Sequence, residues 1–90
     1  INKFTYKGQP PHSKETAVLM MADAVEASAR SLKLYTEQTI SDLVDSIISI
    51  QINDHQFDNA AITFHEITVS KDIFKKKLKN IYHSRIEYPQ

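Results

Sequence analysis

The apolar residues between positions 37 and 52 recur at intervals of three and four, and this spacing restricts the fold more than any other feature. The residues that share this face are Ile40, Leu43, Val44, Ile47 and Ile48. Such intervals place side chains on one side of an α-helix, whereas a half-buried strand alternates apolar and polar residues. Thr36 offers a side-chain oxygen that can cap the first turn. We therefore predict a helix over 37–52.

The segment 14–32 carries a second apolar stripe at the same spacing. Its members are Ala17, Val18, Met21, Ala24, Val25, Ala29 and Leu32. Ser13 is a favourable N-cap, and the Pro10–Pro11 pair prevents a helix from beginning earlier. We predict a helix over 14–32 whose small side chains allow a neighbouring helix to approach closely.

A third helix is predicted over 63–83. Thr63 and Glu66 have the spacing of a capping box, and Ile62 and Ile67 can pack together across it. The apolar face of this helix is expected to comprise Ile67, Phe74, Leu78 and Ile81.

The two ends of the chain lack helical periodicity. Residues 1–12 contain the only glycine and two of the three prolines, and we expect them to form an extended arm. Residues 84–90 contain the third proline and are expected to form an extended tail. We find no internal repeat or boundary. The prediction is an all-α fold, with three amphipathic helices in a single domain over 1–90.

The charge balance limits the partners of the chain. Eleven basic and eleven acidic side chains give a net charge of zero, which argues against binding of DNA or RNA. We interpret the basic run from Lys75 to Lys79 as a solvated helix end. No apolar run approaches the ~18 residues of a membrane span, so we expect no membrane contact by this segment itself. Because the chain begins at Ile1 and not at Met, we expect it to be a piece of a longer protein.

Three ionisable residues interrupt the first predicted helix. Asp23, Glu26 and Arg30 are three and four positions apart and therefore share one side of it. They form either a solvated strip with a Glu26–Arg30 ion pair, or part of a site completed by residues elsewhere. Because its neighbours are apolar, we expect Asp23 to be at least partly buried. A buried carboxylate needs a cation, a metal or several hydrogen-bond donors.

The four histidines show no spacing typical of a metal site. His12, His55, His65 and His83 lie in the arm, a loop, a helix start and a helix end, and none has a His–Asp or His-x-x-x-His motif. A complete site needs three or more ligands. The chain also lacks cysteine, so it has no thiolate ligand. We interpret the histidines as exposed polar residues.

The segment "FTYKGQPPHSKETAVLMMADAVEASARSL" resembles the C-terminal half of the HD-type phosphohydrolase domain in the seven-transmembrane HD family. Similarity continues in order through "INDHQFD", "ITFHEI" and "IYHSRIEYPQ", so that it spans nearly the whole chain. The residues of the first helix that match are Glu15, Ala22, Asp23, Val25, Glu26, Ala27, Arg30, Ser31 and Leu32. The departures are Lys7 and Gln9 for prolines, Lys14 for arginine and His55 for glycine. These four positions lie in the arm, a loop and a helix start, where they affect the backbone conformation. They do not change Asp23.

The resemblance implies a partial HD-domain helical bundle with a metal site. It places Asp23 at the distal aspartate that binds a divalent metal ion, manganese or iron, in the intact domain. Glu26 and Arg30 would then help to position this ligand or a nearby loop. The other ligands of HD domains precede the segment that Ile1 begins. We therefore expect this chain by itself to bind no catalytic metal and to be inactive.

The resemblance also implies the function of the parent protein. Members of this family are bacterial membrane proteins, and their cytoplasmic HD domain hydrolyses a cyclic dinucleotide, cyclic di-AMP, by means of metal-activated water. Helix faces that normally meet the rest of the domain would be exposed here, so we expect self-association into a homo-oligomer. The alternative is a non-catalytic helical interaction module in which Asp23, Glu26 and Arg30 form a surface strip.

Overall fold

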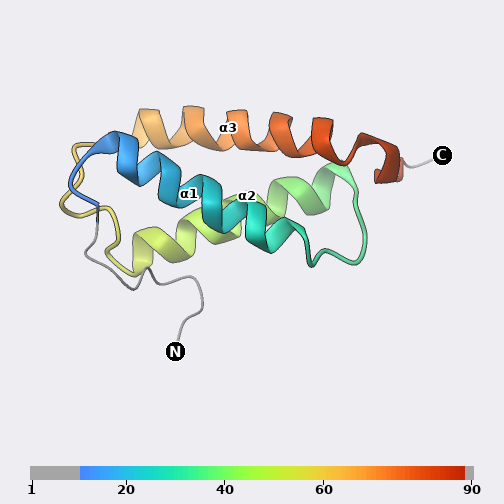
Figure 1. Cartoon of the computed structure of the whole chain (residues 1–90), viewed down its shortest axis with the longest axis horizontal. Coiled ribbons are helices and arrows are strands. Elements are labelled where there is room, and N and C mark those ends of the chain that lie inside the picture. The colour runs from blue at the N-terminus through green and yellow to red at the C-terminus, as the bar shows by residue number, and fades with distance from the viewer. Residues whose placement is uncertain (1–10, 89–90) are drawn as a thin grey trace.

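Three helices make up most of the protein in a computed structural model that describes residues 11–88. They are α1 (Lys14–Ala29), α2 (Glu37–Asn53) and α3 (Phe64–Ile81), followed by one short 3₁₀ turn, η1 (His83–Arg85). α1 and α3 run in the same general direction, and α2, which lies between them in the sequence, runs in the opposite direction (Figure 1). No strand occurs within residues 11–88, where the single bridge joins Tyr35 and Ile86. The all-α prediction is confirmed.

The predicted helix starts are confirmed by their caps. The side chains of Ser13, Thr36 and Thr63 accept hydrogen bonds from backbone amides in the first turns of α1, α2 and α3, respectively. Glu66 completes the predicted capping box by accepting from the Thr63 amide at 2.9 Å. These bonds satisfy amides that have no partner inside the helix, which explains why each helix begins where it does.

The predicted helix ends and the tail were partly wrong. α1 ends at Ala29 and not at Leu32, because the Tyr35 hydroxyl donates to the Ala29 carbonyl at 2.7 Å and the chain turns back. α3 ends at Ile81. The tail is not extended throughout, since η1 forms first and the Glu87 amide then donates to the Tyr35 carbonyl at 2.7 Å. Residues 1–10 of the predicted arm lie outside the described residues.

The core lies where α1, α2 and α3 meet, and α2 contributes most of its largest fully buried side chains. The largest fully buried side chains are Met21, Ile40, Val44, Ile48 and Gln51. The Gln51 amide nitrogen donates to the Met20 carbonyl at 3.3 Å, which joins α2 to α1 inside the core. The apolar face predicted for α2 is thus confirmed, and Gln51 is a polar extension of it that the apolar pattern did not reveal.

An aromatic cluster joins the tail to the end of α1. The rings of Tyr35 and Tyr82 stack with centroids 4.5 Å apart, and the Arg85 guanidinium lies 4.5 Å from the Tyr35 centroid. Burial, followed by the nearby Tyr35, raises the pKa of Tyr82. Stacked rings and a cation over a ring face each stabilise such a corner. The corner holds the C-terminal ends of α1 and α3 in one arrangement.

Candidate functional site

An open groove of about 160 Å³ lies between α1 and α3. The α1 side is formed by Ala22, Val25 and Glu26. The α3 side is formed by Ile73, Phe74, Lys77, Leu78 and Ile81. Ile81 was predicted to lie on the buried face of its helix, but its exposed fraction is 53% because it stands at the edge of this groove.

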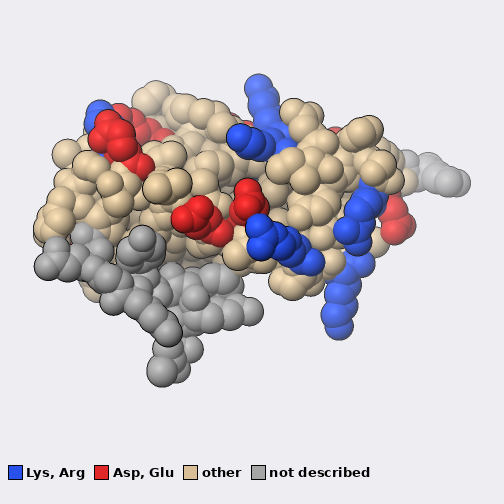
Figure 2. Space-filling view, viewed as in Figure 1, with Lys and Arg blue, Asp and Glu red and all other residues tan. Residues whose placement is uncertain are grey.

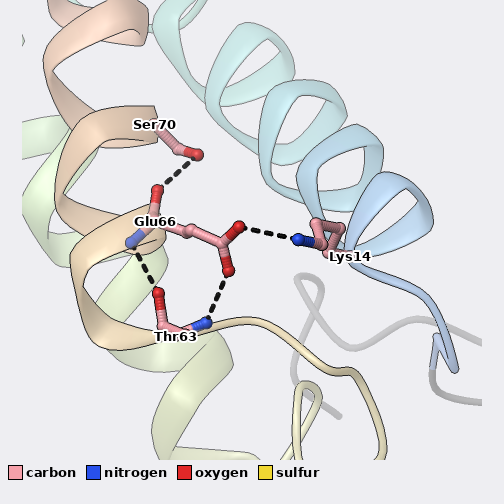
Figure 3. Close-up of polar contacts among 4 residues, drawn as sticks. All are labelled: Lys14, Thr63, Glu66 and Ser70. Carbon is pink, nitrogen blue, oxygen red and sulfur yellow. Dashed lines mark hydrogen bonds and ion pairs between the residues drawn. The ribbon is translucent and has the colours of Figure 1, made fainter.

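A network of polar contacts joins the first turns of α1 and α3 (Figure 3). Lys14 Nζ lies 2.9 Å from Glu66 Oε2, while Glu66 and Thr63 exchange the two bonds of the capping box. The Ser70 hydroxyl donates to the Glu66 carbonyl at 2.8 Å. The hydrogen bond from Lys14, followed by the one from the Thr63 amide, lowers the pKa of Glu66 to about 2. This network sets the position of α1 against α3 at their N-terminal ends.

Asp23 lies on the surface of α1, and the expectation that it is partly buried was wrong. Met21 and Val25 point into the core, and Asp23 is two residues from each, which is about 200° around the helix. Its apolar neighbours therefore indicate a buried helix but not a buried aspartate. Within residues 11–88, Asp23 has no hydrogen-bond or ion-pair partner.

Asp23 is not among the residues that line the groove. It lies about 100° around α1 from Ala22 and about 60° from Glu26, and both of these line the groove. Acidic side chains, with basic ones beside them, lie over α1 at the centre of the view in Figure 2. The Arg30 guanidinium lies 3.0 Å from a Glu26 carboxylate oxygen. The Glu26–Arg30 pair is thus confirmed, and no contact within residues 11–88 joins either residue to Asp23.

The described histidines do not complete a site around Asp23. All four are exposed, and no group of three His, Cys, Asp or Glu side chains within residues 11–88 could hold a metal ion. The predicted exposure of the histidines is confirmed, and His55 Nδ1 lies 3.0 Å from Asp58 Oδ2, three residues further along the chain. This pair lies in the exposed loop between α2 and α3.

His55 also explains one departure from the family pattern. Its φ is 60°, in the left-handed region that glycine occupies without steric cost. The loop keeps this backbone shape with a histidine in place of the usual glycine. Histidine is among the residue types that occur there more often than most.

The lysines near the end of α3 contact different parts of the molecule. Lys75 reaches across to Asp45 on α2 at 3.0 Å, and Lys77 borders the groove. These lysines therefore point to different sides of α3. None of the described helices is long and apolar enough to cross a bilayer.

Two α3 residues of the groove, Ile73 and Lys77, were missed by the sequence analysis, whereas Phe74, Leu78 and Ile81 were predicted to lie on the apolar face. Val69, Ile73, Lys77 and Ile81 are spaced by four, which is a second stripe beside the buried one. The sequence analysis sought a single apolar face on this helix and therefore did not find the second stripe. It assigned Ile81 to the core and placed Val69, Ile73 and Lys77 on no face. A helix with two apolar stripes is the signal that could have revealed the groove.

Comparisons of sequence and of structure both show similarity to PgpH proteins. No family model matches the chain. It is 42% identical over 88 residues to the cyclic-di-AMP phosphodiesterase PgpH of Bacillus subtilis and 38% identical over 86 residues to PgpH of Listeria monocytogenes. An uncharacterized protein of Synechocystis is 32% identical over 88 residues. The chain spans 12% of the length of each PgpH protein, and these matches cover 98% and 96% of the chain.

The fold matches a crystal structure of the L. monocytogenes PgpH HD domain in complex with cyclic di-AMP. The TM-score is 0.83 at 38% identity, and the match covers 92% of this chain and 39% of that one. A second crystal structure of the same domain gives a TM-score of 0.81 at 37% identity, covering 87% and 38%. The helices therefore form part of an HD-domain bundle. The chain thus matches a portion of the HD domain of the PgpH proteins.

Proposed function

We propose that the chain is part of an HD-type phosphodiesterase domain that hydrolyses cyclic di-AMP. The observation that carries this proposal is the structural match to the PgpH HD domain in its complex with cyclic di-AMP. Residues 1–90 then form one continuous part of that single domain. The parent protein is a bacterial membrane protein, and this part belongs to its cytoplasmic domain.

Asp23 is the metal ligand that this chain contributes. Its carboxylate is exposed, has no partner within residues 11–88 and projects from a helix whose opposite side is fixed in the core. A carboxylate of this kind suits a hard divalent ion, manganese or iron. When bound, such an ion acts as a Lewis acid on a phosphodiester. The described residues fit one ligand position and leave the other positions to the rest of the domain.

Glu26 and Arg30 act as positioning residues in this proposal. Their ion pair covers the turn of α1 that follows Asp23, and Glu26 borders the groove. The pair restrains the rotamers of both side chains beside the site. Neither residue is assigned a contact with substrate.

The chain alone is inactive in this proposal, since it provides a single ligand. Apolar side chains on its surface then promote self-association, which light scattering over a range of concentrations would detect. A concentration-independent monomer would contradict self-association. Hydrolysis of cyclic di-AMP by the isolated chain with added manganese would contradict the proposed division of the site.

The role of Asp23 is tested in a complete HD domain in which this chain replaces the matching part of L. monocytogenes PgpH. We expect that domain to hydrolyse cyclic di-AMP with manganese. Asp23→Ala should lower the rate at least about 100-fold, since residues that only orient metal ligands contribute roughly 10–100-fold.

Asp72→Ala is the matched control for this substitution. Asp72 is also an exposed helical aspartate without a partner within residues 11–88, and it lies on α3 instead of α1. The control should keep the full rate. Equal rates for Asp23→Ala and the unsubstituted domain would refute the ligand role.

A further inference from the structure

Gln51 of α2 is the most deeply buried polar side chain within residues 11–88, with an exposed fraction of 0%. Its amide nitrogen donates to the Met20 carbonyl of α1 at 3.3 Å, while its Oε1 accepts no hydrogen bond from the described residues. One long bond and one unpaired acceptor contribute little to folding, and an apolar side chain of similar size would fill the core at least as well. Stability therefore does not explain this glutamine.

The packing of α1 gives the hydrogen bond a different role. The side chains that α1 buries are mostly alanine and methionine, and they comprise Ala17, Met20, Met21, Val25 and Ala29. Alanine leaves only low ridges on a helix, and methionine adapts its shape to its surroundings, so such a surface permits small rotations of the helix. A directional hydrogen bond opposes rotation, because it weakens steeply when its geometry changes.

The bond from Gln51 holds α1 one turn before Asp23. In an α-helix the carbonyl of residue 20 faces the amide of residue 24, so Gln51 contacts the peptide group next to the turn that carries Asp23. The other buried side-chain bond to α1 within residues 11–88 comes from Tyr35, at the C-terminal end of the helix. Gln51 thus provides the buried polar contact near the middle of α1.

A small rotation of α1 would displace the Asp23 carboxylate substantially. Asp23 is exposed on the outer side of the helix. A side-chain group about 6 Å from the helix axis moves by roughly 1 Å when the helix turns by about 10°. Metal–ligand distances allow errors of only about 0.2 Å. A carboxylate that binds a metal ion therefore needs a helix whose rotation is fixed.

We infer that Gln51 is a positioning residue, which fixes the rotation of α1 and thereby the direction of the Asp23 carboxylate. This inference rests on the proposed function, in which Asp23 is a metal ligand. Gln51 acts through the backbone of α1 and is assigned no contact with the ion or the substrate. Groups that orient metal ligands contribute about 10–100-fold to metal affinity, and an indirect contact belongs at the lower end of this range.

Binding of Mn²⁺ to the complete domain described above tests this role without substrate, with free Mn²⁺ followed by electron paramagnetic resonance. Gln51→Met nearly keeps the size of the side chain and removes the bond. It should weaken the Mn²⁺ affinity about 10-fold, while the melting temperature of the metal-free domain stays unchanged or rises. Gln56→Met is the matched control, because Gln56 is also buried and its side chain makes no hydrogen bond within residues 11–88. It should keep the original affinity.

A third variant separates positioning from general stability. Ile48→Val removes one buried methylene from α2 and no bond to α1, so it should lower the melting temperature by a few degrees and leave the Mn²⁺ affinity unchanged.

Amide hydrogen exchange in the metal-free domain follows the Asp23 turn directly. Gln51→Met should speed exchange at residues 23–26 at least about 3-fold, because the turn is held less firmly, and Gln56→Met should not.

An unchanged Mn²⁺ affinity in Gln51→Met would overturn the inference, as would an equal loss of affinity in Gln56→Met or Ile48→Val. A Gln51→Met domain that melts well below the unsubstituted one would also overturn it, since the glutamine would then be needed for stability. Weaker binding with unchanged exchange at residues 23–26 would do the same, because the effect would not pass through that turn.

The proposed function fails separately, if Asp23→Ala leaves the Mn²⁺ affinity of the domain unchanged. In that case faster exchange at residues 23–26 in Gln51→Met alone would still support control of the α1 rotation by Gln51. Equal exchange in the two glutamine variants would overturn that control as well.

Discussion

The two sides of α1 differ in how far their side chains and backbone groups are buried or paired with other residues. On its inner side, Met21 is buried, and the Met20 carbonyl accepts a hydrogen bond from Gln51 of α2. On its outer side, Asp23 is exposed and has no partner within residues 11–88, and Ile73 in the groove between α1 and α3 is 55% exposed. One side holds the three helices together. The other side carries an unpaired carboxylate and exposed apolar side chains, which contribute little to holding the three helices together.

The largest loss of stability should come from a substitution in the core, where α1 packs against α2. Ile48→Ala removes a fully buried side chain at the centre of α2 and should lower the free energy of unfolding by about 2–5 kcal/mol. Ile73→Ala, in the groove, should change it by less than about 0.5 kcal/mol, since exposed substitutions leave no cavity. Urea unfolding of both variants measures the difference. A large loss for Ile73→Ala would show that the groove side also stabilises the isolated chain.

Loss of a helix cap should have a smaller effect. Thr63→Ala removes the side-chain oxygen that accepts from the Glu66 amide at 3.0 Å and should cost about 1 kcal/mol. Thr68→Ala, in the next turn of α3, removes only an exposed hydroxyl bonded to the Phe64 carbonyl and should have little effect. Thermal unfolding followed by circular dichroism compares the two. Equal losses would mean that the cap does not set the start of α3.

The loop between α2 and α3 should allow a gain in stability. A left-handed backbone costs a non-glycine residue about 1–2 kcal/mol, and the greater flexibility of glycine in the unfolded chain offsets roughly half of this. His55→Gly should therefore raise the free energy of unfolding by up to about 1 kcal/mol. His55→Ala has the same steric cost as histidine and should give no such gain. Denaturant unfolding that shows a loss for His55→Gly would contradict this account of the loop.

The ion pair between Lys14 of α1 and Glu66 of α3 should make the free energy of unfolding depend on pH. The pKa of Glu66 falls from its ordinary value of 4.5 to about 2 on folding, so the folded state favours the carboxylate. Its contribution is complete above pH 4.5 and is lost as the pH falls toward about 2. Urea unfolding between these limits should show a weaker acid dependence for Glu66→Gln. Glu37→Gln, at the start of α2, should keep the original dependence, and equal flattening in both would point to a general charge effect.

The smallest effect should come from the exposed pair on α1. Arg30→Ala removes an ion pair whose side chains are 69% and 62% exposed, and it should cost only a few tenths of a kcal/mol. In the complete domain the same change should still slow hydrolysis measurably if Glu26 and Arg30 position the site. Glu15→Ala, another exposed charge on α1, is the control for the rate. A large loss of stability with an unchanged rate would reverse the interpretation of this pair.

Much of the fold could be predicted from local patterns. The starts of α1, α2 and α3 were predicted because Ser13, Thr36 and Thr63 cap them through contacts within four residues. The end of α1 could not be predicted, since Tyr35 determines it by reaching back to the Ala29 carbonyl. Asp23 was expected to be partly buried because its neighbours in the sequence are apolar. Its position about 200° around the helix from Met21 and Val25 instead places it on the surface.

The sequence by itself determined the three helices, the apolar face of α2 and the ordered motif that relates the chain to the seven-transmembrane HD family. These depend on residues close in the chain or on a pattern that can be compared directly. Only the tertiary structure decided that Asp23 faces outward, that Lys14 pairs with Glu66 and that α1 and α3 leave a groove. Each of these depends on how two helices are placed against each other, which is set by the summed packing of the core.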